Sequence, residues 1–271
     1  MTWLVAGGGV IVALAAYFLG RHQAGRAKVY QVLANLRGRL TENLSPVLRS
    51  TPVDVELSKR FERESLIHVE AFLDDQSLEE MRAEALSVAD RAERTFIPLH
   101  KKGGTISYER IHYCAPRCLA FYHSKLVQNW VSAVVGEQIG PTADHDQSSL
   151  SLLVYSQAGD HINWHYDHNF YKGRHFTVLL SLVNRGRQGG ASSSQFCRRT
   201  PQGDEVVSTV ENNLVVFEGA RCLHRATAAS DGDLRIQLSM TFGTTPKIGL
   251  FKEFIRRIKD TAFYGLRVLW D

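Results

Sequence analysis

The sequence has few cysteines and no compositionally biased segment or internal repeat. Its four cysteines, among 271 residues, are too few and too scattered for a disulfide-stabilised fold. Cys114 and Cys118 have the spacing of half a zinc site, but no second Cys/His pair at suitable spacing follows them. We therefore expect reduced thiols in a reducing compartment. The chain also lacks an H-E-x-x-H motif, which argues against a zinc hydrolase.

Charge is absent from the first part of the chain. Residues 2–19, TWLVAGGGVIVALAAYFL, form an uncharged run just long enough to cross a bilayer as a helix. Arg21, Arg26 and Lys28 follow the run, so the positive-inside tendency places the rest of the chain in the cytoplasm. A cleaved signal peptide is the alternative, but the basic segment that should precede its apolar core is missing. We expect residues 1–25 to form an uncleaved, single-pass membrane anchor.

The remaining charge is unevenly distributed. Residues 1–49 carry six Lys/Arg against one Glu and residues 247–271 carry six against three acidic residues, which leaves −4 for residues 50–246 of a net +4. A nucleic-acid-binding module would carry its basic surface on the folded domain, so we expect no nucleic-acid partner. Basic ends are better suited to a membrane surface.

We expect a basic linker or helical segment over 26–64, a globular domain over 65–246, and a basic amphipathic helix over 247–271. That last helix lies either in the membrane interface or on the domain.

Local patterns predict two helices followed by a series of short strands. The segment SLEE at 77–80 has the pattern of a capping box and predicts a helix from Ser77 to about Glu93. A second helix is expected from Leu119 to Val135, ending at Gly136 or Gly140-Pro141. Short strands are predicted at 150–156, 161–167, 175–182, 193–198, 205–210, 213–218, 222–227 and 234–242. Strands without intervening helices favour a mainly β fold with flanking helices, a sandwich or a jelly roll.

The stretch NWHYDHNF contains a candidate metal-binding pair. His165 and Asp167 share one face of an extended strand, with Cα atoms about 7 Å apart. Such a pair is weak evidence alone, since a solvated turn would look the same. His224 is the best third donor, and two histidines with one carboxylate form the facial triad of non-haem Fe(II) oxygenases. Arg235 shares a strand face with Gln237, and a buried guanidinium there would require an anion such as a dicarboxylate.

Four blocks in this order resemble the Fe(II)/2-oxoglutarate-dependent dioxygenases, and in particular their prolyl-hydroxylase-like branch. The resemblance covers roughly residues 66–243 and implies a double-stranded β-helix, or jelly-roll, core. The blocks are IHVEAFLDDQSLEEMRAEAL, YSQAGDHINWHYD, SLVNRGRQGG and NLVVFEGARCLHRATAASDGDLRIQLSMTF.

The resemblance also implies the cofactors and their ligands. It makes His165, Asp167 and His224 the Fe(II) ligands and Arg235 the anchor for the distal carboxylate of 2-oxoglutarate, with O₂ as the oxidant. Tyr155 falls where the family often has a tyrosine that binds the same cosubstrate, although core packing is an alternative. Prolyl hydroxylases usually carry Lys in place of this arginine, and Gln237 replaces the serine of an Arg-x-Ser variant, so the subfamily stays open.

The expected function is therefore that of a membrane-anchored dioxygenase. It would hydroxylate an unactivated C–H bond of a lipid-like or membrane-presented substrate and release succinate and CO₂. Trp164, Tyr166, Asn169 and Tyr171 lie close enough in sequence to the triad to contact the substrate. The alternatives are a peptidyl or small-molecule hydroxylase of the same superfamily and a non-catalytic, membrane-tethered jelly-roll scaffold. A cupin-type protein would use His-x-His where this chain has His-x-Asp.

Overall fold

The computed structural model describes residues 31–39 apart from 33 and 36, then 44–49, 53–143, 146–249, 252–253 and 255–256. Within these residues the strands form one antiparallel sheet with the order β1-β10-β7-β12-β5-β3-β6-β11-β8-β9, to which β2 adds beside β3 and β4 beside β12. The strands are β1 (Leu66–Val69), β2 (Glu93–Ile97), β3 (Lys101–Ile106), β4 (Gly140–Pro141), β5 (Leu150–Tyr155), β6 (His161–His165), β7 (His175–Arg185), β8 (Phe196–Thr200), β9 (Gly203–Val207), β10 (Leu214–Phe217), β11 (His224–Ala226) and β12 (Leu234–Gly243).

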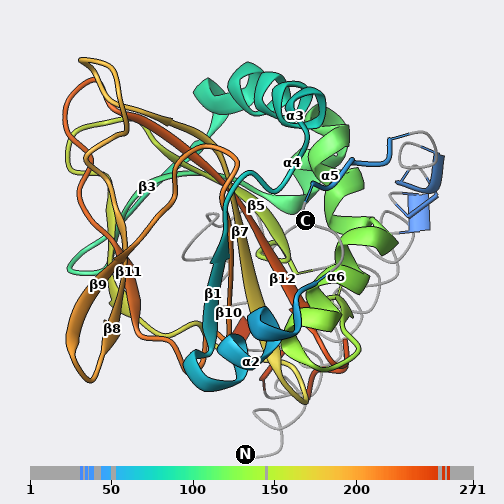
Figure 1. The fold of residues 1–271 in the computed structure, drawn as a ribbon. Helices are drawn as coiled ribbons and strands as arrows, with labels where there is room; N and C mark the ends of the chain where they lie inside the picture. The colour runs from blue at the N-terminus through green and yellow to red at the C-terminus, as the bar shows by residue number, and fades with distance from the viewer. Residues whose placement is uncertain are drawn as a thin grey trace, which may run out of the picture.

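The sheet is rolled so that its two halves face each other. Phe196 of β8 and Phe217 of β10 lie far apart in the strand order, yet their ring centroids are 5.5 Å apart. Figure 1 shows the helices on one side of the half that contains β1, β10, β7 and β12, with β8, β9 and β11 on the other side. The helices are α2 (Val55–Glu64), α3 (Asp75–Val88), η1 (Ala89–Arg91), α4 (Tyr108–Cys114), α5 (Pro116–His123) and α6 (Lys125–Val135). This arrangement confirms the prediction of a mainly β fold with flanking helices.

The central strands present two chemically different faces. On β12, Ile236, Leu238, Met240 and Phe242 belong to the hydrophobic core, whereas the alternate residues line a cavity. The neighbouring strands β5 and β7 alternate in the same way, because successive side chains on a strand point to opposite faces. One face therefore packs against the helices and stabilises the fold, while the other is free to carry polar groups. The predicted alternation along 234–242 agrees with this arrangement.

Each of the eight predicted strands corresponds to a strand of the sheet, with shifted ends. The most relevant shift is in β6, which ends at His165, so Asp167 follows the strand instead of lying within it. The capping-box prediction is wrong. Asp74, not Ser77, caps α3, because its carboxylate accepts a hydrogen bond from the Ser77 backbone N–H at 2.9 Å. The predicted second helix is divided into α5 and α6 by Ser124, whose backbone is extended.

The structure also contains elements that sequence patterns did not predict. The antiparallel hairpin of β2 and β3 follows η1, and β3 pairs with both β5 and β6. Helix α2 lies within the segment expected to be a linker or helix. Its Phe61 is buried, with its ring centroid 5.9 Å from that of Phe176 on β7.

Residues beyond β12 run alongside the segment that follows the metal-binding pair. Ile248 forms a β-bridge with Tyr171, and the Lys172 backbone N–H donates to the Lys247 carbonyl at 2.8 Å. Arg256 is only 2% exposed and pairs with Glu253 at 2.8 Å and with the buried Asp146 at 3.8 Å. The part of the C-terminal segment that the structure describes therefore packs on the domain, as one of the two alternatives predicted.

The predicted membrane anchor, residues 1–25, lies outside the described residues. Of the helices in the described ranges, none combines the length and the apolar character that crossing a bilayer would require.

Arg256 offers a test of how the C-terminal segment packs. Arg256→Ala should lower the free energy of unfolding by about 2 kcal/mol, because it removes the buried cation that pairs with Asp146 and Glu253. Chemical denaturation of the full chain measures this change. Lys252→Ala is the matched control, since Lys252 is exposed and makes one hydrogen bond to the Asn169 carbonyl. Equal and small effects of both substitutions would contradict the packed arrangement.

Candidate metal and cosubstrate site

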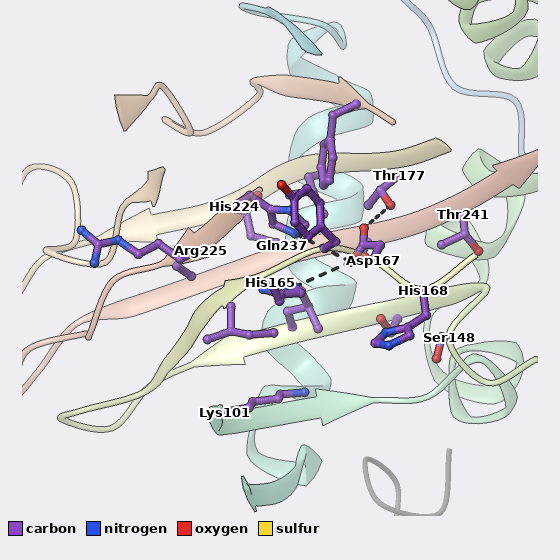
Figure 2. A pocket seen from close by; sticks show the side chains of 18 of the residues that line it. Lys101, Ser148, His165, Asp167, His168, Thr177, His224, Arg225, Gln237 and Thr241 are labelled. Carbon is purple, nitrogen blue, oxygen red and sulfur yellow. Dashed lines mark hydrogen bonds and ion pairs between the residues drawn. The ribbon is translucent and has the colours of Figure 1, made fainter. Parts of the chain in front are cut away.

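Three predicted ligands meet in one cavity. His165 at the end of β6, Asp167 just after it and His224 at the start of β11 have donor atoms that all lie within 4.8 Å of one another. Asp167 Oδ1 is 3.6 Å from His165 Nε2 and 3.7 Å from His224 Nε2. Figure 2 shows the two histidines and the aspartate converging on one point. Pairing of His224 with His165 across β11 and β6 brings two ligands that are far apart in sequence side by side.

Hydrogen bonds fix which nitrogen each histidine offers. His165 Nδ1 lies 2.7 Å from the Asn163 carbonyl, and His224 Nδ1 lies 2.9 Å from the Cys222 carbonyl. A carbonyl only accepts, so Nδ1 carries the proton in both rings and Nε2 keeps its lone pair. Both lone pairs are therefore available for a metal, in the arrangement that backbone carbonyls commonly impose on metal-binding histidines.

Two neighbours position the carboxylate of Asp167. The Thr177 hydroxyl on β7 donates to Asp167 Oδ2 at 2.6 Å, which leaves Oδ1 as the oxygen that faces the histidines. Gly219 lies directly behind the carboxylate and accepts a hydrogen bond from the Asp167 backbone N–H at 3.0 Å. A Cβ at Gly219 would lie 2.8 Å from Cγ of Asp167, so any other residue there would displace the carboxylate.

The electrostatic environment keeps His165 and Asp167 in the protonation states that bind a metal. Burial, reinforced by His224, lowers the pKa of His165 to about 4, so its ring is neutral at physiological pH. Burial on its own would raise the pKa of Asp167. His224, His165 and the hydrogen bond from Thr177 outweigh this effect, so the pKa lies below its usual value and the carboxylate is ionised. The donor set thus offers the nitrogens of two imidazole rings and one anionic oxygen, which suits Fe(II).

Arg235 is a buried cation on the same cavity. It is 1% exposed, and among the described residues it has no carboxylate partner; its Nε has no hydrogen-bond partner. Its guanidinium carbon lies 5.3 Å from the centroid of the Tyr155 ring. Burial lowers the pKa of Arg235, which is the expected sign of a cation that lacks an anion in a poorly solvated place. The position is prepared for a carboxylate from a ligand.

Tyr155 and Gln237, which line the cavity near Arg235, differ in what they offer such a ligand. Burial raises the pKa of Tyr155, so its hydroxyl is a neutral donor, and Tyr155 lines the cavity while its ring packs against Ala226. Gln237 donates its amide nitrogen to Ser181 Oγ at 2.8 Å, and the Ser181 hydroxyl donates to the Thr209 carbonyl at 2.8 Å. This bond uses one of the two N–H groups of the Gln237 amide, and the Gln237 Oε1 atom has no hydrogen-bond partner among the described residues.

The cavity encloses about 240 Å³ and is lined by both halves of the sheet. Tyr166 and Tyr171 line it as expected, but Trp164 and Asn169 are not among its lining residues. Trp164 instead packs beneath the guanidinium groups of Arg199 and Arg225, at 4.3 and 4.6 Å. The sequence patterns gave no sign of five lining residues, which are His100, Lys101, Asp146, Thr177 and Arg225. His100 and Lys101 were missed because the hairpin that carries them was not predicted.

Comparison with known proteins begins at the level of sequence families. A family model described as Halogenase D matches residues 51–175, a range that includes His165 and Asp167 and ends before His224 and Arg235. No curated protein matches the chain.

Solved structures give a consistent view of the fold. The non-haem α-ketoglutarate-dependent epimerase SnoN from nogalamycin biosynthesis superposes with a TM-score of 0.56 at 15% identity, over 69% of this chain and 79% of that one. A prolyl-4-hydroxylase from Pseudomonas putida superposes with a TM-score of 0.54 at 14% identity, over 69% of this chain and 96% of that one. EctD from S. alaskensis, solved with 2-oxoglutarate and 5-hydroxyectoine, superposes with a TM-score of 0.55 at 11% identity, over 76% of this chain and 83% of that one. The chain thus has the fold of the Fe(II)/2-oxoglutarate oxygenases, which confirms the resemblance at the level of fold.

Gly219 provides a test of the site that does not require a substrate. Gly219→Ala should weaken Fe(II) binding by about 10- to 100-fold, because the added methyl group pushes Asp167 Oδ1 away from the histidines. Anaerobic titration of the full chain with Fe(II), monitored by calorimetry, measures the affinity. Gly140→Ala is the control, since a Cβ at Gly140 meets no atom within 4 Å. Unchanged Fe(II) affinity in Gly219→Ala would show that Asp167 does not ligate the metal.

Proposed function

We propose that this chain is an Fe(II)- and 2-oxoglutarate-dependent dioxygenase that hydroxylates an unactivated C–H bond. The observation that carries the proposal is the burial of Arg235, without an anionic partner among the described residues, on the cavity that holds the His165–Asp167–His224 cluster. A metal-binding triad alone would fit many functions. A triad together with a buried, unneutralised guanidinium fits a ligand that joins a metal-chelating group to a distal carboxylate.

Each residue then has a defined role. His165 Nε2, His224 Nε2 and Asp167 Oδ1 would hold the iron from one side, and Thr177 would keep Asp167 Oδ2 away from the metal. Arg235 and the Tyr155 hydroxyl would bind the distal carboxylate of 2-oxoglutarate. When bound, iron with 2-oxoglutarate and O₂ supplies the oxidation of a C–H bond, with succinate and CO₂ as by-products. The walls around the site, including Phe196, Phe217 and Leu179, exclude bulk water.

The match to a halogenase family suggests halogenation as a second candidate, and Asp167 argues against it. An octahedral ion has six positions. With His165, Asp167 and His224 as ligands, 2-oxoglutarate and O₂ would take up the remaining positions, so a halide would have no place to bind. Because the Asp167 carboxylate is ionised and faces the histidines, we assign hydroxylation to this chain.

For the substrate we propose a lipid-like or membrane-presented molecule. The support is the uncharged run at residues 2–19, followed by basic residues, which would hold the domain on the cytoplasmic face of a membrane as a single-pass anchor. The cavity of about 240 Å³ falls below the roughly 300–1,000 Å³ of sites that engulf a whole small molecule. Once 2-oxoglutarate is bound, most of the substrate must therefore lie outside.

The alternatives are a peptidyl or small-molecule hydroxylase and a non-catalytic scaffold. One structural neighbour, a prolyl hydroxylase from Trichoplax adhaerens with a TM-score of 0.56 at 13% identity, was solved with a peptide fragment, and SnoN was solved with an antibiotic. A peptide would also leave most of its length outside the cavity. The scaffold alternative is disfavoured because a chain without cosubstrate has no physical reason to bury Arg235.

Cosubstrate binding tests the proposal directly. Anaerobic addition of Fe(II) and then 2-oxoglutarate to the full chain should give the visible metal-to-ligand band of a chelated keto acid. His165→Ala should abolish the band. Arg235→Ala should weaken 2-oxoglutarate binding by about 100-fold or more, because it removes a buried charged contact. Arg199→Ala is the control, since Arg199 pairs with Asp204 outside the cavity. A well-folded chain that gives no band would establish the scaffold alternative.

Halide sensitivity separates hydroxylation from halogenation. In the wild-type chain, chloride or bromide should leave the energy of that band unchanged, because no coordination position is open to the halide. In Asp167→Ala the two halides should shift the band by different amounts, as each enters the vacated position. Absorption and circular dichroism spectra of the anaerobic complexes measure the shift. A halide-dependent shift in the wild type would favour the halogenase assignment.

A further inference from the structure

The hairpin between β2 and β3 ends in a protruding apolar tip. We define the apolar tip as residues 96–99, Phe-Ile-Pro-Leu. Phe96 is 69% exposed and Leu99 is 93% exposed, the highest value of any large hydrophobic residue in the described part of the chain. Pro98 between them is also exposed. Single exposed leucines are ordinary, but an exposed Phe at the end of β2, with exposed Pro and Leu side chains on the turn that follows, calls for an explanation.

The backbone at this tip is strained. Leu99 has a φ of 62°, in the left-handed region where side chains with a Cβ are disfavoured. Glycine or asparagine would adopt this conformation at lower cost. The Leu99 side chain does not compensate for the strain by packing, since it is almost wholly in solvent. An outlier of this kind, which contributes nothing to the core, points to a role in binding.

The tip is held rigidly beside the metal-binding pair. The Asn163 side chain donates to the Leu99 carbonyl at 2.7 Å, and the Asn163 backbone N–H donates to the His100 carbonyl at 2.7 Å. Asn163 lies on β6, two residues before His165. The next residue after the tip, His100, lines the cavity, and its ring centroid is 5.6 Å from that of His165.

The tip adjoins the cavity, because His100 directly follows it and lines the cavity. Tyr166, which is 50% exposed, and the exposed His168 also line the cavity and flank Asp167 on the segment that follows β6, so the cavity reaches solvent there. Lys102, at the other end of the turn, places a cation beside the apolar residues, and its Nζ donates to the Ala158 carbonyl at 2.7 Å. Protruding apolar side chains with an amphipathic tyrosine and a lysine nearby match the composition of segments that enter the interface of a bilayer.

We propose that the apolar tip inserts into the surface of a lipid bilayer and so places the cavity opening against the membrane. The chain itself argues for a bilayer over a protein partner, because residues 2–19 form the uncharged run whose length matches a membrane span. The tip is also convex, with Phe96 and Leu99 projecting into solvent. A fluid bilayer accepts such projections without a preformed pocket. The proposal concerns contact with lipid and is independent of the chemistry at the metal site.

Site-specific photocrosslinking tests the proposal with the full chain in vesicles of phosphatidylcholine and phosphatidylserine. A benzophenone side chain is placed at position 96 or 99, and in a control at position 206, where Val206 is 56% exposed on β9. Because the readout is local, it is unaffected by how residues 1–25 bind lipid. Positions 96 and 99 should give about tenfold more lipid adduct by mass spectrometry than position 206. Lipid adducts no more abundant than those of the control, or adducts to protein instead, would overturn the proposal.

A second variant tests the premise that Leu99 is not there for stability. Leu99→Asn should raise the Tm by about 3 °C, because asparagine tolerates the left-handed backbone. The control is Leu126→Asn, which changes an exposed leucine of α6, where no positive φ occurs. It should not raise the Tm. A lower Tm for Leu99→Asn would mean that Leu99 stabilises the fold, and the argument from strain would fail.

Discussion

The alternation of side chains along β5, β7 and β12 is the constraint on which the rest of the structure depends. Because successive residues point to opposite faces, the strands can pack Leu152, Leu180 and Leu238 against the helices and still give their other face to a polar cavity. A shift of one residue in the register of β12 would bury Gln237 in the core and move Ile236 into the cavity. The same pairings that stabilise the fold therefore place Arg235 opposite Tyr155.

The site combines positions that cost stability with contacts that hold them. Arg235 is buried without an anionic partner among the described residues, and the donor atoms of the triad converge within 4.8 Å of one another. Under the proposed function, a metal and a dicarboxylate would offset both costs, and little binding energy would be spent on reorganising the site. The supporting contacts come from the scaffold: Thr177 and Gly219 fix Asp167, and backbone carbonyls fix the two histidines. The site is thus organised before its ligands arrive.

The sequence was sufficient where structure follows from local chemistry. Strands with alternating residues were predicted close to their true positions, and the spacing of His165 and Asp167 gave the metal-binding hypothesis. Prediction from the sequence failed where contacts between residues far apart in the chain determine the local structure. Lys101-Lys102-Gly103-Gly104 has the composition of a turn, but it becomes a strand because β2 pairs along one edge of it and β5 and β6 pair along the other. Asp74 replaces Ser77 as the cap because the Ser77 hydroxyl accepts a hydrogen bond from the Val47 backbone N–H. Gly219 behind Asp167 had no sequence signal, since closeness in space depends on the whole fold.

The small cavity, the unpaired arginine and the exposed hairpin together restrict what the substrate can be. If Arg235 and Tyr155 bind the cosubstrate as proposed, the substrate would approach from the side of the triad where Tyr166 and His168 are exposed. A freely diffusing small molecule would favour an enclosing wall there. The structure instead presents Phe96 and Leu99 to solvent close to His100, which lines the cavity. On the proposed function, these side chains would stabilise a complex if the substrate arrives as part of a larger apolar surface, from which one reactive group reaches into the cavity.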